Sequence, residues 1–360
     1  MTGLAAFRSR FSWLDRWSLA VLVLWVAWAA VAAARAGVWL VPTSPYVVAP
    51  LMVVLGVLAG ERAARRVPAR VLAGVVLVLA LLFLVGVLTT AAPGKRPLGY
   101  ANANAAFALQ LVALAGLALV GLGRVGPGRV GPGRVGPGRV RADQRTRADR
   151  RRADQRTRQL AWGGIGVALL VVVANRSVGA MAVAGPLCLA VLWSHLRLRR
   201  RWPYPVTALL AAAAAAAAVF QLAATPVWPT QLLRALDSAR QSLWQDALAA
   251  WASAPVAGVG PGILHTMTRL GGDPDTAPVH SLLLQVGAET GWIGVGLLVA
   301  LVVTALLWAS RGSARGAVIG CASIAALLVH SQMDHLVDFW PVSLAAGLVI
   351  GLAGCRSFGQ

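Results

Sequence analysis

The chain has 360 residues, of which 58% are hydrophobic and only 12% carry a charged side chain. A soluble protein typically has about twice that charged fraction, so the composition excludes an ordinary water-soluble enzyme. Lys and Arg outnumber Asp and Glu by 33 to 12, but the cations fall in short clusters between long apolar runs. This pattern excludes a basic nucleic-acid-binding domain and is typical of a polytopic membrane protein.

Apolar stretches of about 20 residues, the length that a helix needs to cross a bilayer, recur along the chain. We therefore expect an all-α polytopic membrane protein with ten spans. Most of the 33 Lys and Arg fall on one side if the N-terminus is cytoplasmic, so the positive-inside rule places both termini in the cytoplasm. The fifth and sixth spans could instead form a re-entrant hairpin. The expected spans are residues 18–34, 44–60, 70–90, 102–122, 160–174, 178–196, 203–222, 281–310, 316–330 and 339–355.

The expected organisation follows the order of the chain. Residues 1–122 hold four spans, 123–159 a disordered basic cytoplasmic linker, 160–222 three spans, 223–280 a large outer loop, and 281–360 three spans. The linker contains three Val-Gly-Pro-Gly-Arg repeats and two copies of Arg-Ala-Asp-Gln-Arg-Thr-Arg. Gly and Pro disfavour a helix and closely spaced arginines repel one another, so we expect disorder. Binding to anionic membrane lipids is the alternative.

Polar side chains are rare inside the expected spans and gather toward the outer ends. Asn102 and Asn104 stand at the start of the fourth span, and Arg176 stands in the turn between the fifth and sixth. The topology rule disfavours a cation on the outer side. Arg176 therefore either extends to lipid head groups or holds a diphosphate at the membrane surface.

The outer loop contains a predicted amphipathic helix over residues 230–251. Arg240 lies on its apolar stripe, where a permanent cation is unfavourable unless an anion meets it. That anion is either the carboxylate of Asp237 or a bound substrate. Farther along, the backbone at Gly258 and Gly260 could approach a phosphate closely, although such glycines also serve simply in turns.

His280 precedes the eighth span, at the outer surface. Ser281, Gln285, Glu289 and Trp292 follow at spacings that place them on one face of the predicted helix. A histidine beside a polar stripe, opposite two arginines, is a candidate general base. Helix capping or simple exposure are the alternatives for His280.

A second polar group surrounds the end of the ninth span, where His335 also lies. His330, Asp334 and Asp338 are four residues apart and would share a helix face, so a divalent ion, acceptor binding or a solvated helix end would each explain them. We expect no metal ligand and no cofactor, because the cysteines lack the spacing of a zinc site or a disulfide framework. The cysteines are Cys188, Cys321 and Cys355.

The segment from His280 to Gly294, HSLLLQVGAETGWIG, resembles the His…Glu-x-Gly…Gly element of the O-antigen ligase and polymerase family of bacterial membrane glycosyltransferases. Three more segments are similar to family elements and occur in the family's order. They are Arg240…Trp244…Pro255…Gly258-Val-Gly260, the helix entry Tyr100-Ala-Asn102-Ala-Asn104, and the turn Asn175-Arg176-Ser177, which replaces Ser-Arg-Gly. The resemblance covers roughly residues 98–341.

The resemblance implies that a glycan is transferred from undecaprenyl diphosphate to an acceptor hydroxyl at the outer face of the bacterial cytoplasmic membrane. It implies inversion at the anomeric carbon, without a metal or nucleotide, and an acceptor hydroxyl on a glycan, lipid or protein. Arg176 and Arg240 would bind the diphosphate, whose developing charge fixed guanidinium groups can stabilise, and His280 would be the base. We expect further substrate contacts from Asn102, Asn104, Gly258, Gly260, Gln285 and Glu289.

Two other classes of function stay open at this point. A transporter or flippase of a lipid-linked saccharide would also place cations near a lipid diphosphate. It is disfavoured because few polar residues stand at the middle of the membrane. A non-catalytic scaffold is the third class, and such a protein would bind no polyprenyl diphosphate.

Overall fold

The computed structural model describes residues 12–89, 97–121, 137–196, 198, 200–270 and 278–355. These residues form helices and no strand, which confirms the predicted all-α fold. Among them, eight helices are long and apolar enough to cross a membrane. Two shorter apolar helices, α7 (Val178–Trp193) and α14 (Trp340–Gly354), correspond to the remaining expected spans. The chain is a multi-pass membrane protein.

The chain divides into two compact units, each assembled from segments that are far apart in the sequence. Three segments make up each unit, and five of the described helices have residues in both units. Unit 1 comprises Met1–Val54, Pro205–Trp308 and Leu327–Leu344, and unit 2 comprises Leu55–Tyr204, Ala309–Ala326 and Ala345–Gln360.

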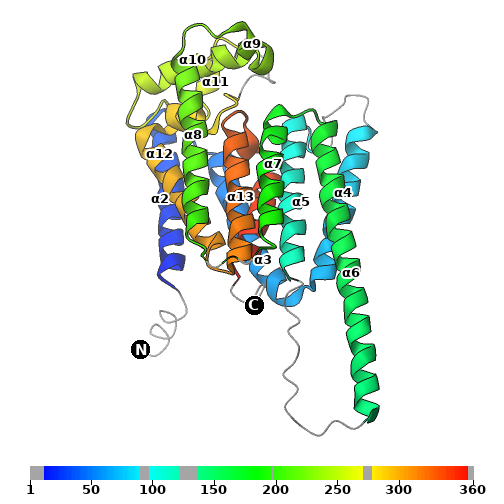
Figure 1. Ribbon diagram of the computed structural model, residues 1–360. Coiled ribbons are helices and arrows are strands. Elements are labelled where there is room, and N and C mark those ends of the chain that lie inside the picture. Colours follow the sequence, from blue (N-terminus) through cyan, green and yellow to red (C-terminus); the bar gives the residue numbers. More distant parts are fainter. Residues whose placement is uncertain are drawn as a thin grey trace, which may run out of the picture. The chain divides into compact units, whose positions relative to one another are not determined.

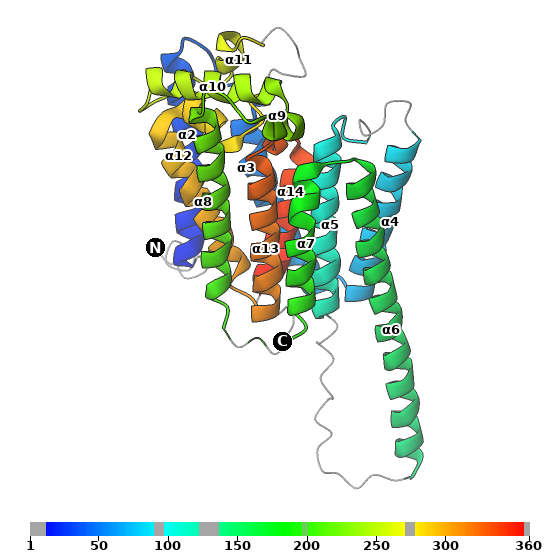
Figure 2. The same cartoon turned by 45° about the horizontal axis from the view of Figure 1, so that its top comes forward.

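Unit 2 is organised around α5 (Ala101–Gly121), whose residues are almost all buried. Helix α5 packs against α4 (Ala69–Leu88), α6 (Pro137–Ala174) and α7. Figures 1 and 2 show that α6 continues well beyond the ends of α4 and α5. Close packing depends on small residues, since a Cβ at Gly116 would meet Val191.

The start of α6 corrects one prediction. The disordered linker expected over residues 123–159 is wrong in its second part, because one helix runs from Pro137 to Ala174. Proline is well tolerated in the first turn of a helix, and the repeats after Gly138 contain mainly Arg, Ala and Gln, which are good helix formers. The glycine- and proline-rich residues 122–136 lie outside the described part of the chain.

Unit 1 is built on α2 (Trp13–Arg35), the first part of α3 (Pro45–Arg66), α8 (Pro203–Ala224) and α12 (Leu282–Ala309). Tryptophan side chains join α2 to α12. The Nε1 of Trp17 donates to the Thr304 hydroxyl at 3.1 Å, and the Nε1 of Trp28 donates to the Thr290 carbonyl at 2.9 Å. A buried cluster completes this core with Trp25, Ala29, Tyr46, Leu282 and Val286.

The loop expected on the outer side, as far as it is described, is called here the cap (residues 225–270). It carries α9 (Thr230–Leu236), α10 (Ser238–Ser253) and α11 (Leu264–Met267), which lie across one end of α8 and α12 in Figures 1 and 2. The single helix predicted over residues 230–251 is wrong, because Asp237 adopts a φ of 65° between α9 and α10. Its carboxylate accepts a hydrogen bond from the Arg240 amide at 2.8 Å and so caps α10.

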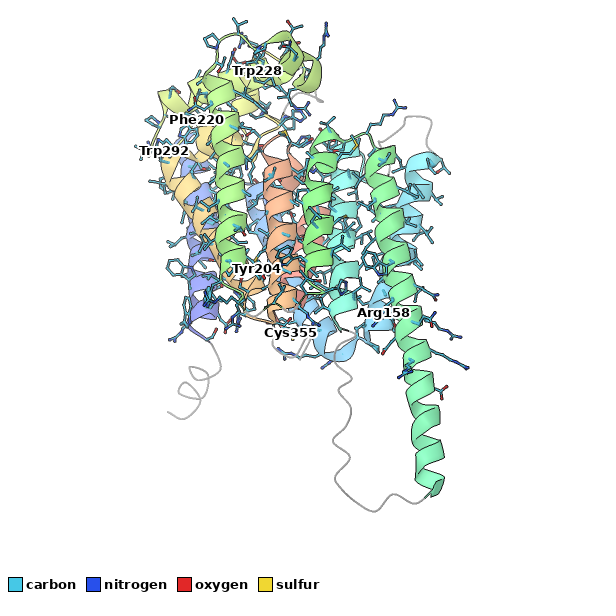
Figure 3. The ribbon with its side chains drawn as sticks, in the orientation of Figure 1. Arg158, Tyr204, Phe220, Trp228, Trp292 and Cys355 are labelled. Carbon is cyan, nitrogen blue, oxygen red and sulfur yellow. The ribbon has the colours of Figure 1, made fainter. Side chains whose placement is uncertain are left out.

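The predicted apolar face of the cap is confirmed. Aromatic side chains at this end of unit 1 include the labelled Phe220, Trp228 and Trp292 in Figure 3. The ring centroids of Trp228 and Trp244 are 5.3 Å apart, and those of Trp251 and Trp292 are 4.5 Å apart. Burial of this face holds α10 against α8 and α12. The buried members of α10 are Leu243, Trp244, Ala247, Ala250 and Trp251.

Candidate active site

His280 lies two residues before α12 and is buried, with 8% of its surface exposed. The helix is capped by the next residue, because the Ser281 hydroxyl accepts a hydrogen bond from the Leu284 amide at 3.4 Å. Capping and exposure, the two alternatives for His280, are therefore both wrong. The φ of His280 is 54°, a left-handed conformation that is costly for a residue other than glycine. Such strain at a buried titratable residue is typical of functional sites.

Asp334 and His335, which follow α13 (Ala314–Ser331), meet His280. The Nδ1 of His280 lies 3.2 Å from Asp334 Oδ1 and 3.1 Å from the Nδ1 of His335. The Nδ1 of His335 is 3.1 Å from the same carboxylate oxygen. We call His280, Asp334 and His335 the His–Asp–His cluster. All three residues belong to unit 1; His280 and Asp334 are buried, and the side chain of His335 is 11% exposed.

The carboxyl group of Asp334 stays charged inside the protein. Burial by itself would raise the pKa of this group, but hydrogen bonds with His280 and His335 outweigh burial and hold the pKa well below its usual range. The His335 amide also donates to Oδ1, at 3.0 Å. A charged carboxylate that accepts from the Nδ1 side of His280 leaves Nε2 as the basic nitrogen of that ring.

Arg240 in α10 faces the other oxygen of the same carboxylate. Its Nη2 lies 3.9 Å from Asp334 Oδ2, an ion pair beyond hydrogen-bond distance. Its Nη1 donates to the Leu236 carbonyl at 3.2 Å and to Asp237 at 3.3 Å, so the Asp237 pair considered from the sequence does form. The buried Nε of Arg240 has no hydrogen-bond partner among the described residues. A donor remains there that an anionic ligand could use.

Glu289 is buried in α12 and receives a hydrogen bond from the Tyr46 hydroxyl of α3 at 2.7 Å. This bond ties the start of α3 to the helix that follows His280. Two residues later, α12 is kinked at Gly291, whose φ of 66° and ψ of −168° are not helical. The kink changes the helical register, so Trp292 is 57% exposed and the prediction that it shares the face of Gln285 and Glu289 is wrong.

The glycine-rich segment after Pro255 packs on this kink. The Val259 amide donates to the Ala288 carbonyl at 2.8 Å, and the Gly260 amide donates to the Glu289 carbonyl at 3.0 Å. The Gly258 amide donates to Ala254, and a Cβ at Gly258 would overlap the backbone of Glu289. Both glycine amides are thus used within the protein, which favours the turn-and-packing interpretation over contact with a phosphate.

A small cavity of about 190 Å³ lies beside Glu289. Its polar lining side chains offer hydrogen-bond donors and acceptors of the kind that bind sugar hydroxyl groups. They are His265, Gln285, Glu289 and Asp338, and burial raises the pKa of the Asp338 carboxyl. Gln285 and Glu289 therefore share a cavity, as their predicted substrate contacts require.

The remaining predicted residues belong to unit 2. Arg176 is exposed in the turn between α6 and α7, with a φ of 52°. Asn104 is fully buried, accepting a hydrogen bond from the Leu98 amide at 3.0 Å and donating to Asn175 at 3.3 Å, an arrangement that favours a structural role. Asn102 is partly exposed, and its amide lies 3.1 Å from the Tyr100 hydroxyl.

The sequence did not predict Asp334 and His335 as partners of His280. Their four-residue spacing with His330 and Asp338 indicated one helix face, but α13 ends at Ser331 and Asp338 lies in the 3₁₀ turn Leu336–Asp338. The prediction that these residues share one helix face is therefore wrong. His330 is itself buried near the end of α13. The useful signal was the gathering of His and Asp residues after a span, rather than their spacing.

Fold and site together define a polytopic membrane protein with a buried histidine, a buried carboxylate and a partly buried guanidinium beside an end of its apolar helices. Residues 163–299 match the family model described as O-Antigen ligase. The matched region includes Arg176, Arg240, His280 and Glu289, and this part of the chain is therefore similar to the O-antigen ligase family. No curated protein gives a significant match to the chain. The family supports glycan transfer of the ligase or polymerase type.

Proposed function

We propose that the chain transfers a glycan from an undecaprenyl-diphosphate-linked donor to an acceptor hydroxyl at the outer face of the bacterial cytoplasmic membrane. In this proposal both termini are cytoplasmic and the cap is on the outer side. The observation that carries the proposal is the group of His280, Asp334 and Arg240. It combines a buried imidazole, a charged carboxylate 3.2 Å from its Nδ1, and a guanidinium 3.9 Å from the carboxylate's other oxygen.

His280 acts as the general base. The oxygen of the acceptor hydroxyl attacks the anomeric carbon as the bond from that carbon to the diphosphate oxygen breaks, so the configuration inverts. The hydroxyl proton passes to Nε2 of His280, while Asp334 holds Nδ1 and stabilises the imidazolium that forms. Asp334 is a positioning residue in this scheme, since it acts through the imidazole.

Arg240 binds the leaving diphosphate. The negative charge of the diphosphate increases as the glycosidic bond breaks, and a fixed guanidinium stabilises that charge without reorganisation. The Nε donor, which lacks a hydrogen-bond partner among the described residues, supports this assignment. Arg176 stays a prediction as a second diphosphate ligand, supported by its exposed position in a turn. Contacts of Asn102, Gln285 and Glu289 with the glycan are predictions too.

The test is transfer by detergent-solubilised full-length protein from a lipid-diphosphate-linked glycan, with products measured by mass spectrometry. We expect His280→Ala to lower the rate by about 10² to 10⁴, the usual contribution of a general base. His195→Ala is the matched control, because His195 is exposed and lies in unit 2. Near-normal transfer by His280→Ala would overturn the mechanism. A wild-type protein that forms no glycan product in this compartment-free assay would favour the transporter class.

A further inference from the structure

The His–Asp–His cluster has a geometry that hydrogen bonds alone do not explain. Its three atoms, His280 Nδ1, His335 Nδ1 and Asp334 Oδ1, form a nearly equilateral triangle with edges of 3.1 to 3.2 Å. A carboxylate oxygen only accepts hydrogen bonds, so each Nδ1 that bonds to it must carry a proton. Two such protonated nitrogens would then face each other as donors across the third edge.

One cation bound by all three atoms would explain the three short distances, because each atom then presents a lone pair to the same ion. Zinc-class ions bind imidazole nitrogen and carboxylate oxygen at about 2.0 to 2.2 Å, which separates neighbouring ligands of a tetrahedral site by roughly 3.3 to 3.6 Å. The observed edges are only slightly shorter. From such an ion, roughly 2.1 Å from each atom, the triangle leaves the outward side for a fourth ligand.

The surroundings hold the three donors in place. The His335 amide fixes Asp334 Oδ1 at 3.0 Å, and the other carboxylate oxygen faces Arg240. The two imidazole rings are nearly perpendicular, with an interplanar angle of 82°. Two neutral imidazoles and one carboxylate favour a divalent transition-metal ion over Ca²⁺ or Mg²⁺, which take mainly oxygen ligands.

We propose that the His–Asp–His cluster binds one divalent transition-metal ion of the zinc class, and that this ion inhibits glycan transfer. The inhibitory part rests on the proposed function. A neutral imidazole coordinated through Nδ1 carries its proton on Nε2, so the metal-bound His280 cannot accept the proton of an acceptor hydroxyl. Metal binding itself does not depend on what the protein transfers.

The first experiment measures binding of Co²⁺, a spectroscopic substitute for Zn²⁺, to chelator-treated full-length protein in detergent. We expect one Co²⁺ per chain with the intense visible absorption of a tetrahedral site. We expect His335→Ala to weaken binding at least 100-fold, because even the loss of a group that only orients a ligand costs about 10- to 100-fold, whereas His195→Ala should bind like the wild type. His335→Cys should restore binding with a new thiolate-to-cobalt absorption, which guards against a variant that simply misfolds.

Equal Co²⁺ binding by the wild type and His335→Ala, or no binding by the wild type, would overturn the metal site. A second experiment adds Zn²⁺ to the transfer assay, where we expect inhibition that a chelator reverses. If wild-type protein binds Co²⁺ but transfers no glycan, the proposed function fails and the metal site stands. If His280→Ala abolishes transfer but the wild type binds no metal, the metal site alone fails.

Discussion

The two units differ in the polar groups that they bury. Among the described residues, the buried polar side chains of unit 2 are all neutral: Asn104, Gln110, Thr157, Asn175, Ser177, Ser194, Ser310 and Ser323. Unit 1 also buries titratable side chains, namely His280, Glu289, His330 and Asp334. Buried charge is costly unless it is paired or used, whereas neutral amides and hydroxyls can be satisfied by one another. The difference supports the proposal that the base and its carboxylate lie in unit 1, and it indicates that the buried polar groups of unit 2 serve its packing.

After His280→Ala, the largest effect is expected from Asp334→Asn in unit 1. Asparagine keeps the shape of the side chain but removes its charge and presents an amide donor, so His280 loses the group that fixes its tautomer. We expect transfer to fall by roughly 10³, less than the loss of about 10⁴ that the same substitution causes in a catalytic Ser-His-Asp triad. Steady-state rates with saturating donor would measure the loss.

Asp246→Asn is the matched control for this prediction. Asp246 also pairs with an arginine of the cap, Arg269, at 2.8 Å, but outside the cluster. We expect its rate to stay within about threefold of wild type, because isolated pairs near the surface contribute little. Similar losses of transfer in both variants would mean that Asp334 only helps to hold the structure of the cap through an ion pair, as Asp246 does.

A smaller loss is expected from Arg240→Ala. Removing one donor to a developing negative charge typically costs about 10² in rate. Arg234→Ala is the control, since Arg234 is exposed on the neighbouring helix α9. If the two variants transfer equally well, Arg240 does not bind the diphosphate and serves only its pair with Asp237.

The smallest effect on transfer is expected in unit 2. The Ser323 hydroxyl donates to the Gln110 side chain at 2.6 Å, and Ser323→Ala removes this bond between buried neutral groups. We expect a loss of about 1 kcal/mol in stability, visible as a melting temperature roughly 2 °C lower, with transfer nearly unchanged. Ser238→Ala, at an exposed position, should change neither. A large loss of transfer in Ser323→Ala would break the contrast between the units.

The sequence predicts the fold well because the length and spacing of apolar runs act locally. Local sequence pattern was also enough to select His280 and Arg240 as candidates, because His280 precedes a polar helix face and Arg240 lies on an apolar stripe. The pairing of His280 with Asp334 was not, since the two are 54 residues apart and meet only through tertiary packing. Helical periodicity misled wherever a helix ended early, as at Asp237 and Ser331.

The central claim is that His280 and Asp334 act as one catalytic unit, and a double-mutant cycle tests it most directly. Transfer rates would be compared for wild type, His280→Ala, Asp334→Asn and the double variant, with melting temperatures measured in parallel. Because Asp334 acts through the imidazole, we expect the double variant to be no slower than His280→Ala alone. A double variant slowed by the product of the two single losses would show that Asp334 and His280 act independently.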